Sequence, residues 1–352
     1  MTSNTQKPIK LSIVFSFRNE QEVLPELIRR SRLVLQTEQN KGTIASYELI
    51  FVNDASSDNS LDILKEHSKQ NNDIRIITMS RCFGVSPCVL AGMEFASGDA
   101  VVYMDADLQD PPEIIPKLLD AWRNSPAEID VVHTVRESRK GESKDKLFIT
   151  RLGYIILNKL SSISLPIEAG DFKLLSRRAV NHLLRMREKN PYLRGLVCWI
   201  GFKSAMVPYH REARYAGGSK FTIYSASVLN NFFGSAMISF SAAPLKVATL
   251  IGLAAILIDF LVMGHALIQK IIGNAIPGWT ALMITVLFFG GTQLFCLGIM
   301  GLYINAMHEQ SKDRPNYIIE STHGFSNENT RNRDHIKRGD WDESRGVDSS
   351  TK

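Results

Sequence analysis

The chain has 352 residues, of which 44% are hydrophobic, and it carries 41 lysines and arginines against 36 aspartates and glutamates. This apolar content excludes a chain that is disordered throughout, and the length is typical of about two domains. The formal net charge of +5 is small for the length and gives no electrostatic reason to expect a nucleic-acid partner.

The first ten residues are polar and lack the apolar segment of a secretory signal peptide. The four cysteines, at positions 82, 88, 198 and 296, form neither a disulfide framework nor a Cys-x-x-Cys zinc motif. We therefore expect reduced thiols and a first domain that stays in the cytoplasm.

Short apolar strands alternate with helical stretches between Lys10 and Val135. The predicted strands are LSIVFSF, YELIFVND, DIRIITMS, AVVYMDAD and IDVVHTV, and helices are expected at Leu24–Leu35, from Ser60, around Pro87–Phe95 and after Pro112. This alternation predicts a parallel α/β sheet that binds ligands at the carboxyl ends of its strands. Acidic residues collect at those ends.

Asp105 and Asp107 follow the strand AVVYM directly. Two carboxylates separated by one residue can both approach a hard divalent cation, and Mg²⁺ or Mn²⁺ bound in this way commonly bridges phosphate oxygens. Gln109 can add a neutral oxygen. A solvated turn is the alternative, but the apolar strand before the motif and the Pro111-Pro112 helix start after it favour a metal site.

Two other predicted strands also end in acidic residues, Glu20 in SFRNE and Asp54 and Asp58 in FVNDASSD. Carboxylates at such positions suit hydrogen bonds to a ribose or a base N–H. For Asp58 the alternative is a helix cap, because Ser and Asp before Leu61 are good N-cap residues. The absence of G-x-G-x-x-G after the first strand counts against a dinucleotide dehydrogenase.

Two apolar runs, at residues 247–268 and 279–306, each exceed the ~20 residues that cross ~30 Å of hydrocarbon. A buried helix pair in a soluble protein is the alternative, but the short connector favours a transmembrane hairpin. That connector holds one basic residue, Lys270, so the positive-inside rule places both termini in the cytoplasm. Asp259 lies midway along the first run, where we favour a structural role at a helix or subunit contact over a catalytic one.

Three further features flank the hairpin. Residues 223–243 carry an apolar stripe at helical spacing, which we interpret as a helix in the membrane interface, with a core-facing helix as the alternative. Residues 308–352 mix both charges with few apolar residues, so we expect disorder there and a dispensable end after about Ser321. The small residues Ala248 and Gly252 would permit close helix packing and self-association.

The ordered set FSFRNE, FVNDASSD, MDADLQDPPE, GDFKLLSR and RYAGGSKF, followed by two apolar spans, resembles the polyprenyl-phosphate glycosyltransferases of glycosyltransferase family 2. This group includes dolichyl-phosphate mannose synthase and the bactoprenol glucosyltransferases. The similarity extends from about residue 9 to residue 303, and DADLQDPPE is its most specific part. It implies an α/β catalytic domain of the GT-A fold in residues 1–222, with the hairpin in residues 244–307.

The resemblance implies roles for the acidic residues. Asp105 would lie near the ribose and diphosphate of a nucleotide-sugar, Asp107 would be the main ligand of Mg²⁺ or Mn²⁺, and Gln109 would assist. Glu20 and Asp54 would hold the nucleoside.

It also implies roles near the reacting centre. Asp171 would orient the acceptor or the donor sugar, the alternative being a cap of the following helix. Arg136, Arg211, Arg214 and Lys220 would contact phosphates, and Arg214 and Lys220 belong to a glycine-containing loop that would close over the donor. A solvated basic loop is the alternative for these cations.

The resulting hypothesis is an inverting, metal-dependent enzyme of the bacterial inner membrane, multi-pass and homo-oligomeric. It would move glucose from UDP-glucose to undecaprenyl phosphate on the cytoplasmic side. A processive polysaccharide synthase is one alternative, although Gln-x-x-Arg-Trp and further spans are missing from the sequence. A non-catalytic, nucleotide-binding membrane scaffold is another.

Overall fold

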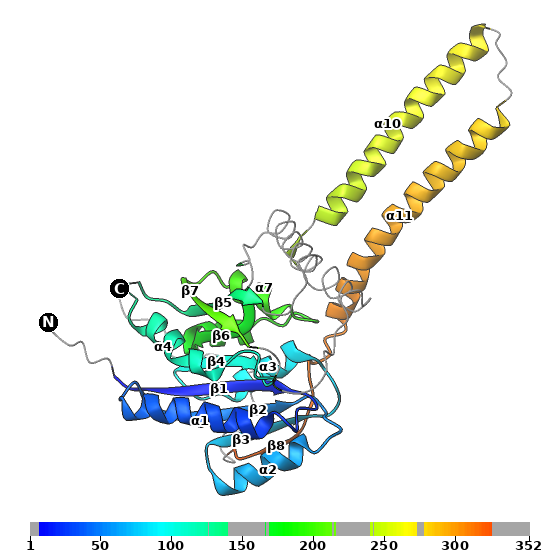
Figure 1. Cartoon of the computed structure of the whole chain (residues 1–352). Coiled ribbons are helices and arrows are strands. Elements are labelled where there is room, and N and C mark those ends of the chain that lie inside the picture. The colour runs from blue at the N-terminus through cyan, green and yellow to red at the C-terminus, as the bar shows by residue number, and fades with distance from the viewer. Residues whose placement is uncertain are drawn as a thin grey trace, which may run out of the picture.

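The computed structural model describes residues 7–125, 127–139, 166, 169–212, 215, 240–241, 243–272 and 278–325. Its centre is a sheet with the strand order β7-β5-β6-β4-β1-β2-β3-β8 (Figure 1). The strands are β1 Ile9–Phe17, β2 Ile44–Asn53, β3 Ile74–Met79, β4 Ala100–Asp105, β5 Val131–Arg139, β6 Ala169–Ser176, β7 Ser204–Arg211 and β8 Ile319–His323.

The predicted parallel sheet is confirmed for the first half of the chain, where β1 pairs in parallel with β2 and β4, and β2 with β3. The sheet as a whole is mixed, because β6 is antiparallel to both β4 and β5, and β8 is antiparallel to β3. Arg211, one of the expected phosphate contacts, belongs to a strand that the sequence analysis did not predict. His210 and Arg211 are the last residues of β7, which pairs in parallel with β5.

Helices cover both faces of the sheet. They are α1 Leu24–Asn40, α2 Ser60–Gln70, α3 Val85–Phe95, the short 3₁₀ helix η1 Pro112–Ile114, α4 Ile115–Arg123, α6 Arg177–Leu184 and α7 Leu193–Trp199. Alternation along β1 divides the core, since Leu11, Ile13 and Phe15 join the cluster under α1 and α4, whereas Val14 joins the one under α3, α6 and α7. Each strand thereby stabilises two layers of helices.

Two long helices, α10 Ala243–Ile272 and α11 Trp279–Ser311, leave the sheet side by side (Figure 1). They are longer than the predicted runs. The two helices contact each other near the sheet, where Tyr303 donates to the Ser241 carbonyl at 2.8 Å and Cys296 Sγ lies 3.4 Å from the Ala248 carbonyl. Their apolar side chains are exposed, as Leu294 is at 71%. Both helices contain a segment long and apolar enough to cross a membrane.

Ala248, one of the two small residues expected to permit self-association, is 5% exposed and packs against α11 of the same chain. For Gly252, the other one, no described atom lies within 4 Å of an added Cβ. Most of the expected interfacial helix, residues 223–239, lies outside the described residues, as does the side chain of Asp259. Phe240, at the end of that stretch, is buried, and its ring centroid lies 6.2 Å from that of Tyr192 beside α7.

The expectation of disorder from residue 308 onward is wrong for part of that segment. Helix α11 continues to Ser311, and β8 pairs with β3 over Ile319–His323. Mixed charge hid this strand, because an edge strand needs only one apolar face and takes its hydrogen bonds from a neighbour far away in sequence. A truncation at Ser321 would cut β8, and residues 326–352 lie outside the described residues.

Gly92 of α3 provides a test of the close contact between α3 and the sheet. A Cβ at this position would lie 2.3 Å from Val14 Cγ1 and 3.1 Å from Val52 Cγ2. We expect Gly92→Ala to lower the free energy of unfolding by about 1–3 kcal/mol through overpacking. Denaturant unfolding measures this, with Gly301→Ala on α11 as a control that meets no described atom within 4 Å. Equal stability of both variants would contradict the packing.

Candidate active site

Sheet topology brings three acidic strand ends together. Strands β4, β1 and β2 are neighbours, and their register places Ser16 beside Asp105 and Phe17 beside Asn53. Ser16 Oγ donates to Asp105 Oδ1 at 3.3 Å, and the Asp54 N–H donates to the Phe17 carbonyl at 3.0 Å. Asp54 and Asp105 therefore lie together at the carboxyl ends of neighbouring strands, as expected.

Each of these strands is followed by a residue in the left-handed backbone region, namely Asn19 at φ 55°, Ala55 at φ 53° and Leu108 at φ 58°. Such angles are uncommon for residues other than glycine and cost free energy. Strained backbone conformations cluster at functional sites. The three turns therefore indicate that the candidate site lies at the carboxyl ends of these strands.

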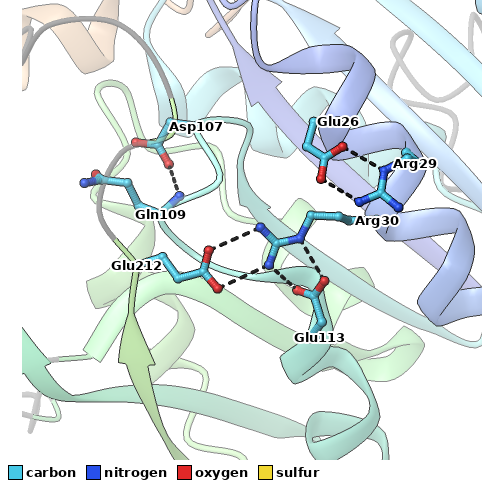
Figure 2. A network of polar contacts seen from close by, with 7 residues as sticks. All are labelled: Glu26, Arg29, Arg30, Asp107, Gln109, Glu113 and Glu212. Atoms are coloured by element: carbon cyan, nitrogen blue, oxygen red, sulfur yellow. Dashed lines mark hydrogen bonds and ion pairs between the residues drawn. The ribbon is translucent and has the colours of Figure 1, made fainter.

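The Asp-Leu-Gln loop after β4 is held from two sides (Figure 2). Asp107, 8% exposed, accepts from the Gln109 N–H at 3.1 Å, and the Gln109 carbonyl accepts from the Glu212 N–H at 3.0 Å. Arg30 of α1 binds Glu113 on one side and Glu212 on the other. This brace fastens the end of β7 to the loop that carries the candidate metal ligands.

Carboxylates crowd the end of β4. Burial and the nearby charges of Asp171, Asp107 and Asp110 raise the pKa of Asp105 to about 7. A divalent cation would relieve this repulsion, and the carboxylate oxygens of Asp105 and Asp107 with the amide oxygen of Gln109 are hard ligands that suit Mg²⁺ or Mn²⁺. Within the described ranges no group of three or more His, Cys, Asp or Glu side chains is placed to hold a metal, so the candidate set is two carboxylates and an amide.

Asp54 holds the loop that follows β3. Its Oδ1 accepts from the Phe83 N–H at 2.6 Å, and its Oδ2 lies 3.0 Å from the Gly84 N and 3.2 Å from Cys82 Sγ. Both carboxylate oxygens are thus engaged by residues 82–84. Direct contact between Asp54 and a nucleoside stays a prediction. Asp54 fixes the position of residues 82–84, which form a wall of the candidate site.

Glu20 and Asp58 both lie beside the start of α2. Glu20 is 9% exposed, and its N–H donates to Ser60 Oγ at 3.0 Å. Asp58 accepts from the main-chain N–H groups of Gln21 and Ser60 at 3.2 and 3.1 Å. For Asp58 these contacts favour the structural alternative, whereas nucleoside binding by Glu20 stays a prediction.

Asp171 forms an ion pair with Arg194 of α7, whose Nε donates to Asp171 Oδ1 at 2.7 Å. Burial alone would raise the pKa of Asp171, but Arg194 and, to a lesser degree, Lys173 and Arg136 lower it well below its usual value. Asp171 is therefore a charged carboxylate that is unsuited to act as a general base, and its role in orienting a substrate stays a prediction. The helix-cap alternative is wrong, because Ser176 Oγ accepts from the Ala179 N–H at 3.1 Å and caps α6 itself.

Two of the predicted cations meet at Asp110, a fully buried carboxylate. The hydroxyl of Tyr209 donates to Asp110 Oδ1 and accepts from Arg136 Nε at 3.2 Å. Arg211 Nε lies 3.5 Å from the same Oδ1. A Cβ at Gly170 would lie 2.9 Å from Arg136 Nη2, so the glycine leaves room for this guanidinium. Arg214 and Lys220 lie outside the described residues.

Residues 12–184 match the family model described as Glycosyl transferase family 2. The chain is 39% identical to an uncharacterized glycosyltransferase, YkcC, of Bacillus subtilis (strain 168), over 91% of this chain and 96% of that protein. It is 34% identical to a bactoprenol glucosyl transferase of Shigella phage SfII, over 90% of this chain and 99% of the phage protein. The chain belongs to glycosyl transferase family 2.

Membership confirms the resemblance, and the observed sheet with two long helices after it agrees with the expected α/β domain of the GT-A fold and helical hairpin. The geometry of this glycosyltransferase also reveals site residues that the sequence analysis missed: Arg30, Asp110, Arg194, Tyr209 and Glu212. Asp110 stands inside the motif DADLQDPPE and could have been noticed there. Nothing local distinguishes the other four, since each becomes recognisable only through its partner.

Tyr209→Phe tests whether the Tyr209 hydroxyl acts through Arg136. The variant leaves a buried Asp110 oxygen without its donor, so we expect a loss of stability of about 1–3 kcal/mol and slower sugar transfer. Tyr209 and Arg136 contact each other. If the hydroxyl acts through Arg136, the double variant Tyr209→Phe with Arg136→Ala should lose no more of the transfer rate than Arg136→Ala alone. Transfer rates of the three variants decide the matter, and additive losses would contradict the linkage.

Proposed function

We propose that this glycosyltransferase moves a single glucose from UDP-glucose to a polyprenyl phosphate, undecaprenyl phosphate, with inversion at the anomeric carbon. One observation carries the proposal: a carboxylate-rich edge that would accept a divalent cation adjoins arginines anchored on Asp110. The first feature suits a nucleoside diphosphate, and the second suits a phosphate acceptor. The names of the phage relatives support glucose and bactoprenol as the two substrates.

Asp105, Asp107 and Gln109 would hold Mg²⁺ or Mn²⁺, which when bound neutralises the leaving diphosphate. Glu20 and the wall shaped by Asp54 would hold the nucleoside. A phosphate monoester is largely ionised at neutral pH, so the acceptor oxygen needs positioning and charge neutralisation more than a base. This agrees with an Asp171 that stays charged beside Arg194.

Arg136 and Arg211 would neutralise the acceptor phosphate, together with Arg214 and Lys220. The acceptor oxygen forms a bond to the anomeric carbon as the bond from that carbon to the diphosphate oxygen breaks on the opposite face, which converts an α-linked donor into a β-linked product. Arg214 follows Glu212 by two residues, and the Glu212 N–H is bonded to the Gln109 carbonyl. This closeness in sequence to Glu212 is the support for proposing Arg214 near the donor diphosphate.

The lipid acceptor and the two exposed apolar helices support a membrane location. We place α10 and α11 across the inner membrane, residues 223–243 in its interface, and the catalytic domain and both termini on the cytoplasmic side, following the charge distribution. Self-association into a homo-oligomer belongs to the same proposal.

Incubation of membranes that contain the protein with radiolabelled UDP- and GDP-sugars, followed by lipid extraction, tests the function. The expected result is label from UDP-glucose in a polyprenyl-phosphate product that mild acid releases. Label that instead enters a long polymer would favour a processive synthase. Absence of lipid label with every donor would contradict the proposed function.

Metal use is tested by Asp107→Asn. Loss of one carboxylate weakens the hold on the cation, so we expect turnover to fall by about 10²-fold or more and the Mn²⁺ concentration for half-maximal rate to rise. Asp120→Asn on the exposed face of α4 makes the same chemical change away from the site and should leave turnover unchanged. Near-wild-type turnover of Asp107→Asn in excess EDTA would rule out this metal set.

The loop cations are tested by Arg214→Ala and Lys220→Ala. Two anions that meet repel each other, and fixed cations offset the repulsion where water is restricted. We expect each variant to lose about 10²–10³ in rate with stability changed by only ~0.5 kcal/mol. Turnover and thermal unfolding of the same preparations separate the roles: unchanged turnover would indicate a solvated loop, and loss in step with unfolding would indicate a structural one.

A further inference from the structure

After α11 the chain returns to the catalytic domain and lies along the sheet edge opposite β7. We call residues 317–325 the strap. Its central part is β8, which pairs with β3, and its last residue, Phe325, packs on Phe95 with ring centroids 5.0 Å apart. Gly324 adopts φ +79° and passes so close to the sheet that a Cβ there would lie 2.6 Å from the Ile74 carbonyl. The strap is thus fitted closely to the domain.

The strap holds one end of the loop Ser80–Gly84 directly and the other end through helix α3. On one side, the Ser80 N–H donates to the Ile318 carbonyl at 3.0 Å, directly after β3 ends. On the other side, helix α3 follows the loop from Val85, and the Tyr317 hydroxyl donates to Glu94, the second-last residue of that helix. A loop of five residues whose two flanking elements are fastened to one segment loses much of its freedom.

This loop forms the wall of the candidate donor site. The Phe83 and Gly84 N–H groups bind Asp54, and Cys82 Sγ accepts from Arg18 after β1 at 3.0 Å. The loop therefore connects the ends of β1 and β2, where the nucleoside is proposed to bind. Its position depends on the strap on one side and on Asp54 on the other.

The residues that lead from α11 into the strap are tied to the segment before α7. Gln310 at the end of α11 bonds the Arg187 carbonyl and the Lys189 N–H, at 3.0 and 2.9 Å, and Asn316 donates to the Glu188 carbonyl at 2.8 Å. These contacts lie where the second apolar helix meets the catalytic domain. The strap is consequently a covalent continuation of the helical hairpin that reaches the donor side of the site.

We propose that the strap is a positioning element of the donor site, with Tyr317 as its main positioning residue, and that it links the placement of the Ser80–Gly84 loop to the helical hairpin. Its effect on donor binding rests on the proposed function, whereas its hold on the loop does not. Loosening the strap frees the loop and weakens donor binding, while the acceptor side at Arg136 and Arg211 is unaffected.

Two variants of the full-length protein reach the strap by different routes. Tyr317→Phe removes only the hydroxyl that Glu94 accepts, and Gly324→Ala forces the end of the strap away from the Ile74 carbonyl. Tyr47→Phe is the matched control, because it removes a half-buried hydroxyl at the amino end of β2, away from the site. Hydrogen exchange of the Phe83 and Gly84 amides and steady-state kinetics with varied donor and acceptor are measured on all three.

The expected result is faster exchange of those two amides in both strap variants and a donor KM raised roughly 2- to 12-fold, the range that corresponds to one hydrogen bond. Acceptor KM and the Tyr47→Phe control should not change. Unchanged amide exchange would overturn the strap's hold on the loop. A lower kcat with unchanged donor KM would show a role in stability alone and would also overturn the proposal. If the unaltered protein transfers no sugar, the proposed function fails and amide exchange still decides whether the strap holds the loop.

Discussion

Repulsion among carboxylates at the end of β4 is the constraint on which the site depends. Four acidic side chains lie close together there, those of Asp105, Asp107, Asp110 and Asp171. Asp107 accepts a hydrogen bond from the Gln109 N–H. Asp171 is paired with Arg194, and Asp110 is engaged by Tyr209 and Arg211. The charge of Asp105 is only partly compensated, so burial and the neighbouring carboxylates raise its pKa, and a bound cation would neutralise that charge. The same carboxylates therefore suit a divalent cation and hold Arg136 and Arg211, the arginines proposed to contact the acceptor phosphate.

Long-range contacts join this charged centre to the helical hairpin from two directions. Phe240, just before α10, packs against α7, the helix that carries Arg194. After α11, the strap reaches β3 and α3 on the other side of the sheet. The proposed soluble donor and the proposed lipid acceptor must meet with fixed geometry for transfer to be fast. Attachment of both sheet halves to the hairpin is a physical means of fixing that geometry.

Much of the fold was predictable from local patterns. Short apolar runs that alternate with helical stretches predicted β1 to β5, and the run DADLQDPPE placed two acids at the end of a buried strand. Three strands, β6, β7 and β8, escaped prediction, and of these β7 and β8 lie at the two edges of the sheet. Strand β7 carries exposed and basic residues, and β8 lies in a mixed-charge segment, because edge strands bury one face at most and depend on a partner strand for their hydrogen bonds.

The sequence by itself determined the periodic elements, the apolar helices and the acidic strand ends, since each depends on residues that are close in the chain. Only the tertiary structure decided which charges pair. Tyr209 and Asp110 are 99 residues apart, Arg194 and Asp171 are 23 apart, and Tyr317 lies 223 residues from Glu94. Such pairs follow from strand order and helix placement, which arise from the packing of the whole domain and leave no local pattern to read.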